Sequence, residues 1–390
     1  MSDSIAEGRR LHKFPRGYSK EDMMERQAIL ENFMSVNFQE PADMPPESLQ
    51  GIIENQIGEM SIPMGMAGPL SVEGRYAKGD FYVPLCTVEG TLVASMTRGM
   101  YATHKSGGIR TAHLQQRMSR APIFFFESIS SQHDFLSWIS EHEQEIKCAA
   151  EATTGYGKLL QIEPYVLNRY VILDFGYETG NAAGQNMVSK ATKNACEYIR
   201  HETGVDFVLD SNFSSDKKSS GITRLKGRGH FVSAQAFLSH QVIEKVLGTT
   251  AKSLNKIQEF GPYASNAAGN QGVQLHLSNA LAAIYLATGQ DVACVAENAV
   301  GFTQTKLTEE GMEFLLTMPS ISVGTVGGGT RLPQQQKCLK LLGCDTDENG
   351  AKKLAEIICA SALCLEISLM AAIVSEKWVG AHMKYGRNKN

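Results

Sequence analysis

The pattern of hydrophobic and polar positions divides the first part of the chain into a polar helical segment and a glycine-punctuated apolar region. Residues 20–33 (KEDMMERQAILENF) predict a helix, which the proline-rich run at 41–46 ends. From Glu54 onward, apolar stretches broken by glycine lead into a strand predicted at 80–88 and a helix predicted at 89–101. Residues 1–53 are therefore expected to form a separate N-terminal helical segment.

Strand and helix patterns then alternate along the middle of the chain. Strands are predicted at 123–128, 170–175 and 205–209, and helices at 132–153 and 182–201. After Gly227 the clearest patterns are helical, at 275–289 and 352–378. The simplest arrangement is a small α/β domain at 121–214 inserted into a larger domain formed by residues 54–120 and 215–390.

Composition and charge indicate an ordinary globular protein. Charged residues make up 20% and apolar residues 43% of the 390 residues, and the net charge of -4 provides no reason to expect a nucleic acid or a membrane surface as partner. The eight cysteines form no CxxC pair, and the N-terminus lacks the apolar region of a signal peptide. We therefore expect a cytoplasmic protein with reduced thiols. The apolar run at 357–374 contains Glu366, which favours a buried helix over a membrane span.

Four short motifs carry residues that could do chemistry. Asp216-Lys217-Lys218 lies among serines and glycine, where it could stabilise a developing alkoxide or simply form a solvated turn. Glu89 follows a strand and precedes a helix, which also suits an acid that complements a helix dipole. Asp291 follows a helix in Gly-Gln-Asp, where a helix cap is the plain alternative. His382 lies in the C-terminal tail and, alone, would be incidental.

Two glycine-rich segments add a candidate cofactor site. Residues 179–187 (TGNAAGQNM) follow a strand and open a helix, a geometry that suits phosphate binding. They do not match GxGxxG, so the sequence does not support a Rossmann fold. Residues 324–330 (GTVGGGT) predict a loop whose backbone could approach a ligand closely.

Taken together and in order, seven segments resemble the 3-hydroxy-3-methylglutaryl-CoA (HMG-CoA) reductases. They are ENQIGEMSIPMGMAGPL, VPLCTVEGTLVAS, TGNAAGQNMVSKAT, SSDKKSSGITRLKGRGHFV, AIYLATGQD, TMPSISVGTVGGGT and AHM. The DKK and GRG text resembles the class of eukaryotes and archaea, without the eukaryotic membrane anchor. The resemblance implies an α+β fold in which a small ferredoxin-like cofactor domain is inserted into a large, mainly helical substrate domain. It also implies NADPH as cofactor, with NADH not excluded, and a homodimer or tetramer whose active site is shared between subunits.

The resemblance assigns roles to the four motifs. Lys217 would stabilise or protonate the oxyanion, Asp291 would keep that lysine charged, and Glu89 would relay protons. His382 would protonate the departing thiolate. Further substrate-binding residues implied by the resemblance are Arg98, Arg120, Asp216, Lys218 and His276. The implied cofactor-binding residues are Gly180, Asn181, Ala182, Gly184, Gln185, Asn186, Gly327, Gly328 and Gly329.

Several positions depart from the family pattern. Asn181 replaces an aspartate, Ala183 and Gln185 replace methionines, and Gln274 replaces an asparagine of the site. Phe260 falls where the family has a lysine that binds the substrate carboxylate, and Asp210 falls where it has a serine. Losing a cation and gaining an anion should disfavour a substrate carboxylate.

These departures lead to three hypotheses. The first is an NAD(P)H-dependent reductase of another acyl thioester, neutral or cationic, carried by CoA or by an acyl carrier protein. The alternative is an authentic HMG-CoA reductase that makes mevalonate. The second alternative is a non-catalytic homologue that binds thioesters. Because Glu89, Lys217, Asp291 and His382 are all retained, the first hypothesis is the main prediction and the binding homologue is disfavoured.

Overall fold

The computed structural model describes residues 14–34, 44–345 and 348–375, and the chain forms two compact units, Met1–Pro63 and Met64–Asn390. The first unit contains the helix α1 (Lys20–Met34), close to its predicted range, and the 3-10 helix η1 (Pro46–Leu49). The guanidinium of Arg26 is buried and donates hydrogen bonds to the backbone oxygens of Gln56, Pro15 and Gly17. This arginine connects α1 to the segments that precede and follow it.

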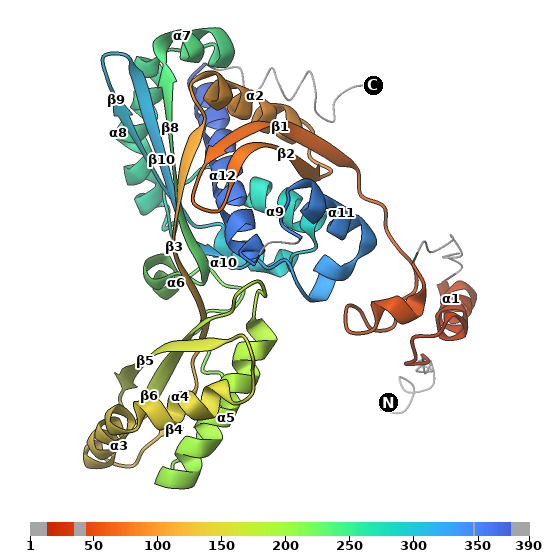
Figure 1. The fold of residues 1–390 in the computed structure, drawn as a ribbon, viewed down its shortest axis with the longest axis vertical. Helices are drawn as coiled ribbons and strands as arrows, with labels where there is room; N and C mark the ends of the chain where they lie inside the picture. Colours follow the sequence, from red (N-terminus) through yellow and green to blue (C-terminus); the bar gives the residue numbers. More distant parts are fainter. Residues whose placement is uncertain (1–13, 35–43, 346–347, 376–390) are drawn as a thin grey trace, which may run out of the picture. The chain divides into compact units, whose positions relative to one another are not determined.

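One continuous sheet organises the larger unit (Figure 1). Its strands are β1 (Met64–Glu73), β2 (Lys78–Cys86), β3 (Ile109–Arg120), β4 (Ile123–Phe125), β5 (Lys158–Leu167), β6 (Tyr170–Glu178), β7 (Phe207–Val208), β8 (Gly229–Ser239), β9 (Phe302–Leu307) and β10 (Gly311–Ile321). Their order is β7-β4-β6-β3-β8-β10-β9, with β5 beside β6 and β1 beside β2 and β3. The strand β3 pairs with β8 over most of its length and with β6 at its end, so it joins two parts of the sheet.

A second hydrophobic core lies around the strands β4 to β7. Its elements follow the order β4, α3 (Ile129–Glu141), α4 (Glu143–Glu151), β5, β6, α5 (Gln185–Thr203) and β7. The core contains Phe124, Phe175 and Ile199, all fully buried. The single helix predicted over 132–153 is two helices, because the chain leaves helical geometry at His142, whose ring stacks on Trp138.

The helix α12 (Gly350–Val374) forms the centre of the larger core. It packs against β3, β8, β10, α2 (Leu92–Lys105) and α9 (Leu277–Thr288), and Figure 1 shows it running between the sheet and these helices. At the crossing with α2, a methyl group on Gly99 would lie 1.9 Å from the Cys364 carbonyl oxygen. The helix is apolar and long enough to cross a membrane, but 89% of its most apolar window is buried inside the protein. The prediction of a buried core helix is confirmed.

The remaining elements of this unit lie around the core. They are α6 (Gly221–Lys226), α7 (His240–Val242), the π-helix η2 (Ile243–Leu247), α8 (Ala251–Ala267), η3 (Val292–Cys294), α10 (Val295–Asn298), η4 (Gly328–Arg331) and α11 (Pro333–Leu341). Helical residues outnumber strand residues in this part, but it also contains six of the strands named above, β1–β3 and β8–β10, so it is a mixed α/β unit. The strand β10 was missed because only Glu313 and Thr317 are polar among residues 312–318, so the sequence alternates weakly between polar and apolar residues.

Candidate active site

The DKK loop places the Lys217 ammonium against a carboxylate from another part of the chain. Lys217 Nζ lies 2.8 Å from Asp291 Oδ2, and both side chains are partly exposed. The hydrogen bond that the Lys217 ammonium donates to the Asp291 carboxylate raises the pKa of the Lys217 amine, so the lysine stays charged at neutral pH. A charged, partly exposed ammonium is suited to stabilise an oxyanion that forms beside it.

A tight turn after α9 holds Asp291. The helix ends at Thr288, and Gly289 follows with φ +72°. Asp291 then caps η3, since its Oδ1 accepts a hydrogen bond from Ala293 N at 3.0 Å. Gly289 is therefore the C-cap of α9 that the motif predicted, while Asp291 is the N-cap of η3 and also the partner of Lys217.

The two glycine-rich segments converge on this turn. Thr325 N donates to the Asn181 carbonyl at 2.8 Å, and Ala182 forms a parallel bridge with Val326. A methyl group on Gly289 would lie 2.4 Å from the Gly329 carbonyl oxygen. The loop formed by residues 327–329 therefore packs directly on the turn before Asp291. Both glycine segments therefore lie beside the Lys217–Asp291 pair.

Two of the substituted residues in the first glycine segment have partners within the chain. Asn181 Oδ1 accepts a hydrogen bond from Ala351 N at the start of α12. Gln185 Nε2 lies 3.1 Å from Cys294 Sγ, in the segment that carries Asp291. These side chains therefore connect the first glycine segment to the larger core.

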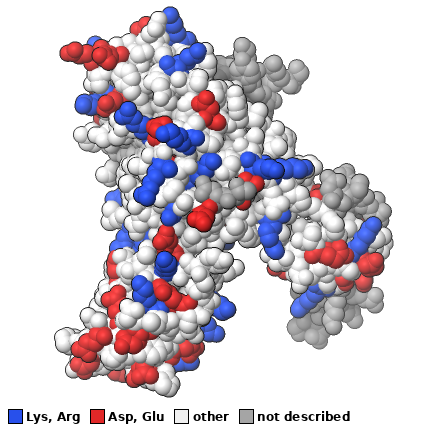
Figure 2. All heavy atoms as spheres, viewed as in Figure 1, with Lys and Arg blue, Asp and Glu red and all other residues white. Residues whose placement is uncertain are grey.

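Arg120 and Asp210 form an ion pair beside the DKK loop (residues 216–218). Arg120 Nη1 lies 2.5 Å from Asp210 Oδ2, and Nη2 lies 3.8 Å from Asp216 Oδ2. Lys218 Nζ donates to the Asp216 carbonyl at 2.8 Å. The carboxylate at position 210 is thus balanced by an arginine beside it. Figure 2 shows that acidic and basic side chains are interspersed over the visible face of the protein.

A second group of predicted residues lies at the opposite end of α9. His276 precedes the helix, and Glu89 Oε1 accepts a hydrogen bond from Asn279 Nδ2 at 3.1 Å. Arg98 reaches α12, where it donates to the Ser368 hydroxyl and carbonyl. From Asn279 to the end of α9 at Thr288 the helix rises about 14 Å at 1.5 Å per residue.

The predicted site is therefore divided within one chain. Lys217 and Asp291 lie with the glycine loops at one end of α9, and Glu89 lies at the other. His382 lies outside the described residues.

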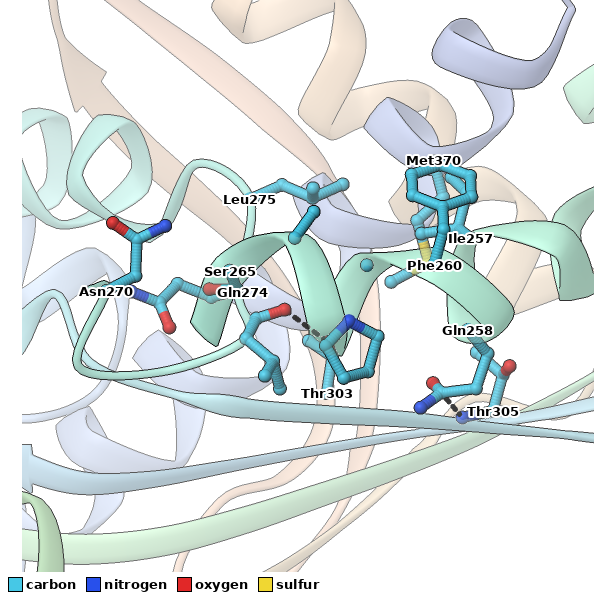
Figure 3. Close-up of a pocket in the computed structure, with 14 residues that line it drawn as sticks. Ile257, Gln258, Phe260, Ser265, Asn270, Gln274, Leu275, Thr303, Thr305 and Met370 are labelled. Atoms are coloured by element: carbon cyan, nitrogen blue, oxygen red, sulfur yellow. Dashed lines mark hydrogen bonds between the residues drawn. The ribbon is translucent and has the colours of Figure 1, made fainter. Parts of the chain in front are cut away.

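Phe260 and Gln274 line a pocket of about 260 Å³ beside α8, shown in Figure 3. Ile257 and Met370 line the same pocket, and Figure 3 labels them near Phe260. The Gln274 amide is used within the protein, since it donates to Ala299 O at 2.8 Å and accepts from Gly301 N at 3.1 Å. Asp210 is not among the residues that line this pocket. Within one chain, Asp210 and Phe260 therefore do not line the same pocket.

Sequence reasoning missed two buried residues behind the DKK loop. Arg228 and Glu297 are both fully buried, and their side chains pair at 2.8 Å. Glu297 Oε2 also accepts the backbone N–H of Lys217 at 2.6 Å. An isolated acid in the apolar run VACVAEN (292–298) was the available signal, because a buried carboxylate needs a partner.

Glu366 is a third buried acid, and it supports a pH prediction. Its carboxylate accepts the backbone N–H groups of Leu275 and His276 at 2.7 and 2.8 Å. Burial nevertheless raises the pKa of Glu366 to about 7. The folded protein then holds a proton that the unfolded chain has released, so stability falls as the pH rises from the ordinary carboxyl range to about 7, by about 1 kcal/mol per pH unit.

The Glu366→Gln variant, which cannot ionise there, tests this expectation. Melting temperatures of both proteins across pH 5–8 (roughly the window in which such a carboxyl titrates) should diverge, with a steeper decline in the wild type. Equal slopes would show that Glu366 does not titrate in this window.

Comparison with known proteins identifies the family. The sequence model described as hydroxymethylglutaryl-coenzyme A reductase matches residues 22–387. The chain belongs to the hydroxymethylglutaryl-coenzyme A reductase family. It is an oxidoreductase family, as the sequence predicted.

Relatives in the family match most of this chain and most of their own length. The 3-hydroxy-3-methylglutaryl-coenzyme A reductase of Methanocaldococcus jannaschii is 40% identical over 343 residues, covering 86% of this chain and 84% of the relative. The enzyme of the same name from Haloferax volcanii is 35% identical over 397 residues, covering 99% and 98%. The class II reductase of Streptococcus pneumoniae, solved bound to NADPH, has a TM-score of 0.68 at 19% identity, covering 90% of this chain and 83% of its own; it supports the mixed α/β fold.

These relatives overturn the hypothesis of a different acyl group. Members of the family that match this chain over nearly all its length are named HMG-CoA reductase, which supports the alternative stated above. The electrostatic argument treated Asp210 as an anion without a compensating cation. In the structure Arg120 balances Asp210, and Phe260 lies on α8, 54% exposed, beside a different pocket.

Proposed function

We propose that this protein is an HMG-CoA reductase that converts HMG-CoA to mevalonate with NADPH. The observation that carries the proposal is the Lys217–Asp291 ion pair beside both glycine segments, in a chain 40% identical to a named HMG-CoA reductase. The reaction consumes HMG-CoA, two NADPH and two protons, and yields mevalonate, free CoA and two NADP⁺. NADPH supplies the two hydrides.

The glycine loops fit a dinucleotide. Gly184 is the N-cap of α5 with φ +85°, and no side chain caps this helix end, so its N-terminal N–H groups suit a phosphate. Gly327 and Gly328 have positive φ, and no atom lies within 4 Å of where a Cβ would be. The residues that would hold the cofactor are Gly180, Asn181, Ala182, Gly184, Gln185, Asn186 and Gly327–Gly329.

The chain's own residues would carry the charge and proton steps. Lys217, kept charged by Asp291, would stabilise the oxyanion of the hemithioacetal and then donate a proton to the alkoxide of the alcohol. Arg120, mostly buried beside the DKK loop, would orient the acyl group. The family resemblance assigns protonation of the departing CoA thiolate to His382.

The direct test measures NADPH oxidation with HMG-CoA and identifies the product by mass spectrometry. We expect mevalonate, with two NADPH consumed per HMG-CoA. Acetyl-CoA, which lacks the free carboxylate of HMG-CoA, serves as the control substrate and should give little oxidation. Failure to form mevalonate from HMG-CoA would refute the proposal.

We further propose a homodimer or tetramer in which Glu89 acts on the Lys217 of another subunit. The support is the separation of the two residues along α9 within one chain. The strand order β7-β4-β6-β5 supports a ferredoxin-like cofactor domain at 121–214. A cytoplasmic location agrees with the burial of α12 in the core.

Subunit complementation tests the shared site. Co-expressed Glu89→Gln and Lys217→Ala chains would form heterodimers that each contain one intact site, so random mixing should restore about a quarter of wild-type activity. Each variant expressed alone is the control and should be nearly inactive. If the mixture is no more active than the separate variants, Glu89 and Lys217 act within one chain.

A further inference from the structure

The backbone of Lys217 adopts a conformation that a residue with a side chain avoids. Its φ is +57°, and Ser215, two residues earlier, has φ +54°. Left-handed backbone at a residue other than glycine costs about 1–3 kcal/mol and persists only where the surroundings enforce it. Because the direction of a side chain follows from the backbone, this conformation decides where the Lys217 ammonium points.

Glu297 supplies the contact that holds this conformation. Its Oε2 accepts the N–H of Lys217 at 2.6 Å, and its Oε1 accepts hydrogen bonds from Arg228 Nη1 at 2.8 Å and Ser322 Oγ at 2.5 Å. A carboxylate with several donors is fixed in position. The Glu297 side chain is fully buried, so water does not compete for the Lys217 N–H.

Arg228 contacts the same loop at Asp216, the residue before Lys217. Its side chain is fully buried, and Nη2 lies 3.2 Å from Asp216 Oδ1. The Arg228–Glu297 pair therefore holds two successive residues of the DKK loop, one by a side chain and one by the backbone.

The segment that contains Glu297 also contains the partner of the Lys217 ammonium. Asp291 lies just before η3, and Glu297 lies in α10, which follows η3 directly. One short segment thus contacts Lys217 at both its backbone N–H and its Nζ. Displacing either contact would change the direction of the lysine.

We propose that Glu297, fixed by Arg228, is a positioning residue that sets the direction of Lys217 for the reaction. Since both side chains are fully buried, neither touches a substrate, and the effect acts through Lys217 alone. The inference rests on the proposed function for its catalytic consequence. Its structural consequence, the pairing of Lys217 with Asp291, is independent of the substrate.

Two double variants separate positioning from stability. Arg228→Met/Glu297→Gln and Arg228→Met/Glu297→Met both remove the buried ion pair, but only glutamine keeps an oxygen that can accept the Lys217 N–H. With similar melting temperatures, the methionine variant should have a kcat at least about tenfold lower than the glutamine variant. The KM for NADPH should be the same in the two double variants.

The second measurement needs no turnover. The rate at which acetic anhydride acetylates Lys217, followed by mass spectrometry against pH, reports the pKa of its amine. Because Asp291 raises that pKa, a misdirected lysine should titrate at lower pH in the methionine variant, and the alkaline limb of kcat should move the same way. If HMG-CoA is not turned over, this titration still tests the positioning role.

Glu297→Asp provides a further variant should the methionine variant fold poorly. It keeps the buried charge and shortens the reach to Lys217 by one methylene, so it should reproduce the lower kcat and the lower pKa. Unchanged Lys217 titration and kcat in Glu297→Asp, or equal values in the two double variants, would overturn the proposal and leave the pair a purely structural one.

Discussion

Replacing Lys217 with alanine is expected to lower kcat with HMG-CoA by about a thousandfold, because the variant loses the charge that faces the developing oxyanion. Asp291, 2.8 Å from Nζ in the wild type, would then present an unopposed carboxylate to the same oxygen. The cofactor loops make separate contacts, so KM for NADPH should change little. Steady-state kinetics over both substrates would measure these effects.

The control for this experiment is Lys306→Ala, which removes an exposed lysine from β9. Its kcat should stay within about twofold of the wild type, since an exposed charge distant from the site is screened by solvent. A Lys217→Ala enzyme that retained a tenth or more of the wild-type kcat would remove the lysine from the proposed mechanism.

Arg228→Met is expected to have the largest effect on stability. It leaves the fully buried Glu297 carboxylate without its cationic partner, and breaking a buried pair in this way costs about 3–5 kcal/mol. Urea unfolding should show a large fall in the midpoint. The cause is the uncompensated charge rather than lost volume, because methionine fills much of the space of the arginine stem.

The double variant Arg228→Met/Glu297→Met distinguishes these causes. Removing both charges should recover most of the lost stability, since a buried ion pair and apolar residues of similar volume differ little in free energy. If the double variant is as unstable as the single one, packing around Arg228 accounts for the loss.

The local elements were largely predictable from sequence, and the failures have identifiable causes. The helices α1, α2, α5 and α12 lie close to their predicted ranges, because each has flanking residues or an apolar pattern that a helix requires. The strands of the larger core were underestimated. In β10 only Glu313 and Thr317 are polar among residues 312–318, too weak an alternation in the sequence to distinguish the strand from a buried helix.

The substrate prediction failed for a spatial reason. Asp210 and Phe260 both depart from the family pattern, and the sequence alone treats them as parts of one altered pocket. Their charges and volumes matter only through their neighbours. Arg120 balances Asp210 at 2.5 Å, and within one chain Phe260 lines a different pocket, so only the tertiary structure shows these neighbours.

The sequence by itself determined the family and the candidate chemical groups, because the motifs around Glu89, Lys217 and Asp291 are short and contiguous. Only the tertiary structure decided which of these groups meet: Lys217 with Asp291, and neither with Glu89 of the same chain. It also revealed Glu297 and Arg228 behind the loop. The physical reason is that electrostatic and hydrogen-bond energies depend on distance and burial, and sequence separation determines neither.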